Sequence, residues 1–187
     1  MTNTQTNKKW FMTPGERAVF KMEGPLVKVG PKHPLWPKRV KAEVLNLKRY
    51  LDYIIQSGGR PWFQLYPSTK KEHNYLIWYG HLNVATRPEI KFDIVVLLPA
   101  TYPIDCPRAL IHDEVLHEYK CSNIYVENKY SDPTTKKTYV MICHDHMKEV
   151  GEAWLPELTI SHFFIREIHT WWEAKQNDII EEWDKKH

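Results

Sequence analysis

Three prolines within nine residues, Pro99, Pro103 and Pro107, constrain this chain of 187 residues more than any other feature. Proline fixes φ, lacks a backbone N–H and restricts the residue before it, so no helix or strand continues through such a segment. The prolines follow the apolar residues 94–98, a run with the length of one strand. We therefore expect a strand that ends in an extended loop of fixed shape.

The segments around this loop have the composition of strands. Residues 62–66, 76–84 and 89–98 are rich in aromatic and β-branched residues, and the short gaps between them predict an antiparallel meander. A fourth strand is expected over residues 108–112. Residues 124–142 look like a hairpin with a proline-containing turn, which we interpret as an insertion or extension.

Helices are expected before and after these strands in the sequence. Steps of four and three separate a set of apolar residues that predicts one helix face: Val40, Val44, Leu47, Leu51 and Ile54. The helix is expected over residues 35–56, and a second long helix is expected to begin near Thr159. The sequence therefore predicts an α+β protein in which helices pack against an antiparallel meander of about four strands.

Length and charge narrow the class of protein. We expect an N-terminal extension over residues 1–33, one core domain over 34–175 and a helical tail over 176–187. The net charge of +3 indicates no strong attraction to nucleic acid or to a membrane surface. No apolar run approaches the roughly 20 residues that span a bilayer. With only three cysteines and no apolar signal segment, a cytoplasmic protein is expected.

The densest group of reactive side chains is Cys143-His144-Asp145-His146, directly after the strand-like residues 138–142. A cysteine at a strand end is expected to be partly exposed, and nearby imidazoles can stabilise a thiolate or carry protons. The pattern predicts a nucleophilic cysteine. The alternative interpretation is a packing cysteine beside histidines that face solvent.

Zinc binding is a competing hypothesis for the same residues. Cys143 and His146 have the spacing C-x₂-H, and His117 and Cys121 have the spacing H-x₃-C, so the four could form a zinc-stabilised interaction domain. Neither half is a C-x₂-C knuckle, which weakens this interpretation. No Walker A loop or dinucleotide-type glycine pattern appears, so no cofactor is predicted.

The proline-rich segment resembles the loop of ubiquitin-like conjugating enzymes, in which a Tyr-Pro-x-x-Pro sequence leads from one strand to the next. Here Tyr102-Pro103 and Pro107 are spaced one residue wider, which is similar to the branch that serves the ubiquitin-fold modifier. Short motifs agree with that branch in order and spacing over about residues 35–172: Leu35-Trp36, Trp62-Phe63-x-Leu65, Trp78-x-Gly80, Phe92-Asp93-Ile94, and Ile142-Cys143 followed by Asp145-His146 and Trp154.

The resemblance implies a ubiquitin-conjugating-enzyme-like fold and a role in ufmylation. Cys143 is then the thiol that accepts the modifier from an activating enzyme as a thioester and passes it to a substrate lysine, usually with a ligase. The neighbours His144, Asp145 and His146 are expected to support this active site.

Other residues acquire expected roles from the same resemblance. The helix over residues 35–56 is implied to dock the activating enzyme, which makes Lys38, Arg39 and Lys41 candidates for partner binding. The branch carries a Thr-Ala-Lys element before its cysteine, and the nearest counterpart here ends in Lys120. Lys136-Lys137 is an alternative source of that lysine.

One element of the ubiquitin enzymes is missing before Cys143. No His-Pro-Asn triplet precedes it, so the sequence does not name the group that supports the oxyanion. A non-catalytic module of the same fold, which only binds a modifier, is a further hypothesis. The presence of Cys143 at the matching position argues against it.

Overall fold

The structure is a computed structural model that describes residue 15 and residues 28–122, 124–143 and 153–187. Its elements follow in the order α2 (Trp36–Gln56), β1 (Phe63–Pro67), the 3₁₀ turn η1 (Lys71–His73), β2 (Ile77–Val84), β3 (Arg87–Leu97), β4 (Arg108–His112), α3 (Glu114–His117), β5 (Ile124–Ser131), β6 (Thr138–Ile142), α5 (Ile160–Phe163), the π-helical segment η2 (Phe164–Ile168) and α6 (His169–Lys186). Among the described helices, none is long and apolar enough to cross a bilayer.

The sheet has six strands rather than the four expected from the sequence. Every pairing is antiparallel, in the order β1-β2-β3-β4-β6-β5. The predicted hairpin is confirmed, and it belongs to the sheet. Its second strand, β6, pairs with β4, with Ile111 opposite Val140. Strand composition predicted each strand, whereas this long-range pairing depends on the tertiary fold.

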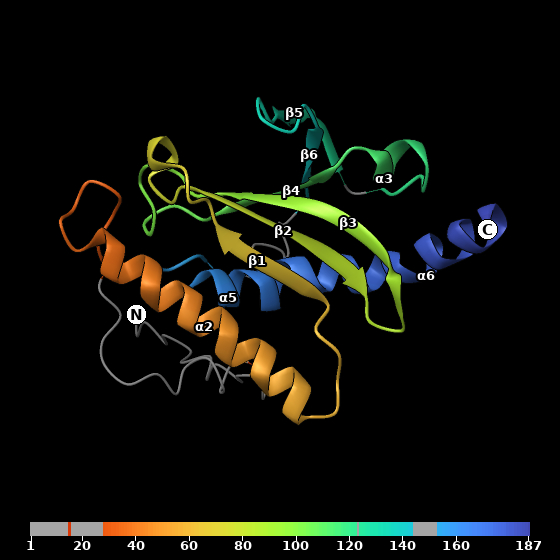
Figure 1. Cartoon of the computed structure of the whole chain (residues 1–187), viewed down its shortest axis with the longest axis horizontal. Helices are drawn as coiled ribbons and strands as arrows, with labels where there is room; N and C mark the ends of the chain where they lie inside the picture. Colours follow the sequence, from red (N-terminus) through yellow and green to blue (C-terminus); the bar gives the residue numbers. More distant parts are fainter. Residues whose placement is uncertain (1–14, 16–27, 123, 144–152) are drawn as a thin grey trace, which may run out of the picture.

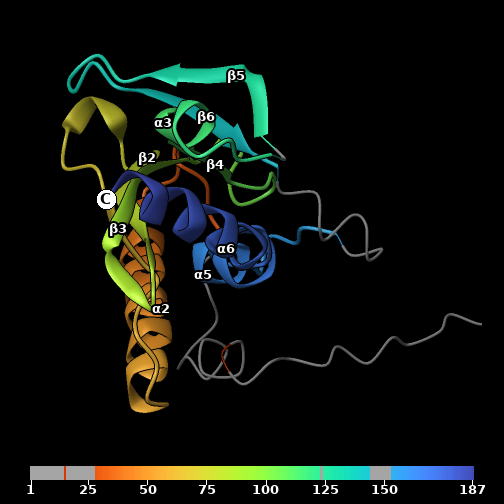
Figure 2. The ribbon, with the colours of Figure 1, turned by 90° about the vertical axis from the view of Figure 1, so that its right-hand side faces the viewer.

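Helices α2, α5 and α6 lie on one face of this sheet, and the hairpin of β5 and β6 forms one of its edges (Figures 1 and 2). Alternate residues of β3 face the helices, and Phe92, Ile94 and Val96 among them are buried in the main core. Val95 points to the other face, where it packs with Leu110 and Tyr139. This period of two is the expected pattern for a strand between two packed surfaces.

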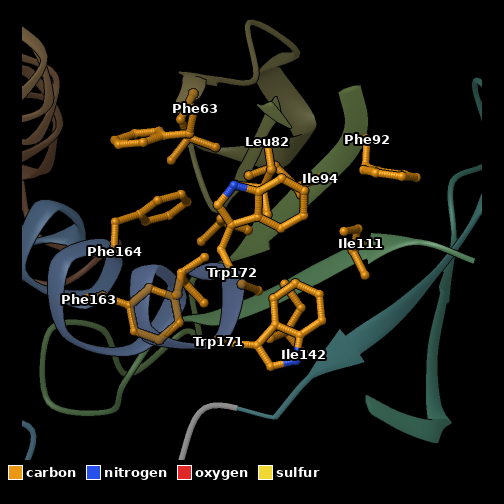
Figure 3. Close-up of a cluster of buried hydrophobic side chains, with 14 of the residues drawn as sticks. Phe63, Leu82, Phe92, Ile94, Ile111, Ile142, Phe163, Phe164, Trp171 and Trp172 are labelled. Atoms are coloured by element: carbon orange, nitrogen blue, oxygen red, sulfur yellow. The ribbon is translucent and has the colours of Figure 1, made fainter. Parts of the chain in front are cut away.

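The main core joins aromatic residues of the last helix to the strands (Figure 3). Phe63 of β1 packs against Phe164, with ring centroids 4.5 Å apart, and Phe92 of β3 packs edge-on against Trp172 at 6.1 Å. Burial of large aromatic rings contributes strongly to the free energy of folding. The many aromatic residues of this chain therefore serve the core.

Helix α2 has the predicted length, and its buried face includes most of the predicted residues together with polar ones. Its buried residues are Trp36, Arg39, Val40, Glu43, Asn46, Leu47 and Tyr50. Val44, which was predicted to be in the core, is 40% exposed. Periodicity counts only apolar residues, so it could not detect a buried face that includes polar side chains with partners elsewhere in the fold.

The C-terminal helix begins where the sequence predicted. Thr159 caps it: the Thr159 carbonyl accepts the N–H of Phe163 at 3.1 Å, and His162 Nδ1 accepts the N–H of Thr159 at 3.0 Å. The helix continues through η2 and α6 to Lys186, and Ile179 near its end is fully buried. Residues beyond 175 therefore also pack against the core.

Candidate active site

Cys143 directly follows the last residue of β6, and its thiol is half-buried. Its Sγ donates a hydrogen bond to the Tyr125 hydroxyl on the neighbouring edge strand β5, at 3.5 Å. The predicted supporting residues His144, Asp145 and His146 lie outside the residues that the structure describes. Their roles stay predictions.

The sequence analysis missed Tyr125. An aromatic residue in a hairpin strand is ordinary strand composition, and its partner depends on the register of the two strands. That register contains an irregularity between Tyr125 and Lys129, which no composition rule predicts.

The other two cysteines have different surroundings. Cys121 is only 7% exposed, and burial raises the pKa of its thiol to about 11, although the nearby Lys175 ammonium opposes this effect. Cys106, in the proline-rich loop, is half-buried against the main core. A buried thiol with a raised pKa is a poor nucleophile, so Cys121 is a packing residue.

The zinc hypothesis finds no support in the described part of the chain. Within it, no three His, Cys, Asp or Glu side chains gather closely enough to hold a metal ion. His117 is exposed while Cys121 is buried, so these two predicted ligands face different surroundings. The fourth predicted ligand, His146, lies outside the described residues.

Lys120 lies in the turn after α3, in the left-handed conformation with φ of 52°. This turn is attached to α6: the Lys186 ammonium donates to the Glu118 carbonyl, and the Tyr119 ring stacks on Trp183. Lys120 itself interacts electrostatically with Glu182 of α6. The contacts that place Lys120 are therefore made with the C-terminal helix, and its role at Cys143 stays a prediction.

The alternative lysines lie at the wrong end of β6. Lys136 and Lys137 precede the strand, whereas Cys143 follows it. Six extended residues span about 20 Å, so neither ammonium lies beside the thiol. Lys137 instead forms an ion pair with Asp93 of β3.

The proline-rich loop forms a fixed structure, as predicted. The Tyr102 ring is fully buried, and the Tyr102–Pro103 peptide bond is cis. The indole N–H of Trp154 donates to the Pro103 carbonyl at 2.8 Å. Because Trp154 follows the segment that begins at Cys143, this hydrogen bond attaches the far end of that segment to the loop.

A buried polar junction, formed by Arg39, Glu43 and Tyr102, joins this loop to α2. Glu43 Oε1 accepts from Arg39 Nε at 2.7 Å and from the Tyr102 hydroxyl at 2.6 Å. Burial, followed by the negative charge of Glu43, raises the pKa of Tyr102 well above its usual value, so the phenol keeps its proton. The second carboxylate oxygen of Glu43 accepts the N–H of Ile160 at 2.9 Å. The junction therefore holds α2, the loop and the start of α5 together.

The prediction that Arg39 contributes to a docking surface was wrong. Its side chain is 0% exposed, and its Nη2 donates to the Leu158 carbonyl at 2.9 Å. Burial alone disfavours its charge, but the Glu43 carboxylate raises the pKa of Arg39 above its ordinary value. Its neighbours Lys38 and Lys41 are exposed and accessible to a partner.

Comparisons with known proteins agree with the motif-based resemblance. Over 159 residues the chain is 27% identical to the ubiquitin-fold modifier-conjugating enzyme 1 of Drosophila sechellia, and 26% identical to those of Drosophila ananassae and Drosophila melanogaster. Each alignment covers 83% of this chain and 84% of the relative. No protein-family model matches the chain.

The chain is similar to ubiquitin-fold modifier-conjugating enzymes. The resemblance predicted from short motifs is thereby confirmed, and the α+β fold is consistent with a conjugating-enzyme fold once the sheet is extended to six strands. The similarity supports the class of ubiquitin-like conjugating enzymes. The chemistry at Cys143 is a separate question.

Proposed function

We infer that this protein is a cytoplasmic conjugating enzyme that carries a modifier of the ubiquitin-fold modifier type as a thioester on Cys143. The observation that carries the proposal is the position of the thiol. Cys143 directly follows strand β6, half-exposed, at the place that the resemblance assigns to the modifier-accepting cysteine. The names of the similar Drosophila proteins support the choice of modifier.

The proposed reaction has two transfers. The Cys143 thiolate first attacks the thioester that an activating enzyme carries, and the modifier passes to Cys143. A substrate lysine amine then attacks the new thioester, usually with a ligase, and an amide bond forms as the thiolate leaves. Because the incoming thioester is already energised, the reaction depends on access and geometry at the sulfur.

The surroundings of Cys143 fit these requirements better than those of the other cysteines. The thiol of Cys121 is buried, and Cys106 packs against the main core in the proline-rich loop, two residues before strand β4. The exposed Lys38 and Lys41 on α2 are the proposed contacts for the activating enzyme. Opposite charge on the partner would steer its approach.

The decisive experiment combines the full chain with the activating enzyme, the ubiquitin-fold modifier and ATP. We expect an adduct of modifier mass that a reducing agent cleaves. Cys143→Ala should abolish it, whereas Cys106→Ala and Cys121→Ala should retain it. An adduct that survives in Cys143→Ala would contradict the proposal, and no adduct with the wild type would favour a non-catalytic binding module.

A simpler experiment compares the three thiols in the native protein. Iodoacetamide should modify Cys143 faster than Cys121, because Cys121 is buried and its pKa is raised to about 11. Peptide mass spectrometry measures each site separately. Native mass spectrometry of protein purified without chelator tests the zinc alternative, and one bound zinc per chain would support it.

A further inference from the structure

The contact between Cys143 and Tyr125 follows from the register of the last two strands. In the β5–β6 pair, Ile124 lies opposite Ile142 and Tyr125 lies opposite Met141. Cys143 comes two residues after Met141, and residues two apart in an extended chain point to the same side of a sheet. Diagonal neighbours across two strands lie within reach of an aromatic side chain. The 3.5 Å separation of Tyr125 Oη and Cys143 Sγ agrees with this geometry.

A bulge in β5 places the tyrosine at this position. Beyond Tyr125 the pairing shifts, and Lys129 lies opposite Val140, so three residues of β5 have no partner in β6. If the register of Lys129 continued without the shift, Asn128 would lie opposite Met141 in place of Tyr125. Bulges that redirect one side chain occur often beside active sites.

The phenol can interact with each state of the reacting sulfur. In the resting thiol, the S–H of Cys143 donates to Tyr125 Oη. A phenol is both donor and acceptor, so rotation of its O–H lets it donate to a thiolate instead. In a thioester, the carbonyl oxygen lies one bond beyond the carbon attached to that sulfur. A donor within contact distance of Sγ can therefore also reach this oxygen.

The sequence before Cys143 supplies no oxyanion donor of the kind that ubiquitin-conjugating enzymes carry there. The His-Pro-Asn triplet, whose Asn supports the oxyanion in ubiquitin-conjugating enzymes, does not precede Cys143. A tetrahedral intermediate of acyl transfer needs a hydrogen-bond donor directed at its negatively charged oxygen. Tyr125 is a described side chain with a polar O–H beside the thiol.

We propose that Tyr125 is a catalytic residue of the transfer, an inference that rests on the function proposed for Cys143. The Cys143 thiol loses its proton to solvent, its thiolate attacks the carbonyl carbon of the incoming thioester, and a C–S bond forms. The carbonyl oxygen becomes an oxyanion, to which the Tyr125 O–H donates while it keeps its proton. The oxyanion then collapses, and the sulfur of the activating enzyme leaves as a thiolate that takes a proton from solvent.

Tyr125→Phe in the full chain tests this role, because it removes the hydroxyl and keeps the ring. Single-turnover loading with the modifier should slow about a hundred-fold. Alkylation of Cys143 by iodoacetamide at one fixed pH should also slow, because the thiolate loses a hydrogen-bond donor. Tyr66→Phe is the matched control: its exposed hydroxyl donates to Gln64 on the opposite edge strand, and it should load at the wild-type rate.

A second variant separates chemistry from packing. Tyr125→His returns an N–H donor on a ring and should regain part of the loading rate. Loading of Tyr125→Phe within two-fold of the wild type overturns the inference, and so does an equal loss in the Phe and His variants. If the proposed function fails, the wild type forms no modifier thioester. The alkylation rates of Cys143 in the wild type and in Tyr125→Phe then still show whether the phenol affects the thiol.

Discussion

The buried polar junction and the surroundings of Cys143 place polar groups in opposite situations. Arg39, Glu43 and Tyr102 are all 0% exposed, and they are bound to one another and to the start of α5. Cys143 lies half-exposed at the end of a strand, beside a tyrosine of the sheet edge. Many buried partners determine the geometry of the first region, whereas the second leaves the candidate nucleophile partly exposed.

This difference separates a region that holds elements of the fold together from a region that leaves a thiol partly exposed. The junction holds α2, the proline-rich loop and the start of α5, and Trp154 attaches the chain after the Cys143 segment to the same loop. A reacting thiol needs room for a large partner, so it cannot be surrounded in the same way.

The largest expected effect is on stability, from Glu43→Gln. The substitution leaves the buried guanidinium of Arg39 without its carboxylate, which should cost about 3–5 kcal/mol of the free energy of unfolding. Urea unfolding measures it. Glu89→Gln, which removes an exposed carboxylate paired with Arg87, is the control and should leave the midpoint unchanged. Equal midpoints for the two variants would show that the junction contributes no stability.

Gly80→Ala should have the next largest effect. A Cβ on Gly80 would lie 1.9 Å from the Gln64 carbonyl oxygen, so β1 has to move away from β2. Overpacking of this kind costs about 1–3 kcal/mol. Gly58→Ala, at a left-handed position with open space around it, should cost less, about 1 kcal/mol. If β1 can move away from β2 at little cost, Gly58→Ala becomes the more destabilising of the two substitutions. Thermal unfolding of both variants measures which one lowers the stability more.

Alkaline pH should destabilise the fold through Cys121. Burial raises the pKa of this thiol from an ordinary value near 9 to about 11, so the folded state binds more protons than the unfolded state between these values. The stabilisation is complete below pH 9 and is lost as the pH rises toward 11, by up to about 2 kcal/mol. Urea unfolding at pH 8 and pH 10.5 should show a smaller loss for Cys121→Ala than for the wild type. Identical losses would contradict the assignment.

The smallest expected effect on stability is at the candidate active site. Tyr125→Phe should change the free energy of unfolding by less than about 0.5 kcal/mol, because its hydroxyl is part of a half-exposed contact at the sheet edge. The same variant is expected to slow loading. A loss of stability as large as that of Glu43→Gln would remove the distinction between the two regions.

Local patterns predicted much of this protein. The length of α2, the start of the last helix at Thr159, the strands and the irregular loop around Pro103 follow from periodicity, capping and proline chemistry, which act between near neighbours in the chain. The position of Cys143 at a strand end followed from the same local patterns.

Residues that depend on distant partners were predicted poorly. Arg39 was assigned to the surface because a charged residue on a helix is usually exposed. Its burial requires Glu43 one turn away together with Tyr102 and Leu158 from two other segments. Tyr125 was missed for a similar reason, because the bulge that places it depends on how two strands pair.

The sequence alone determined the order of the helices and strands, the rigid proline-rich loop and the choice of Cys143 as the candidate nucleophile. Only the tertiary structure decided that the hairpin of β5 and β6 extends the sheet to six strands, that Arg39 lies in the buried polar junction, and that a tyrosine lies beside the thiol. The physical reason is the distance along the chain over which each effect acts. Propensity and periodicity act over a few residues, whereas burial, register and ion pairing depend on residues as distant in the chain as Arg39 and Leu158, which are 119 positions apart.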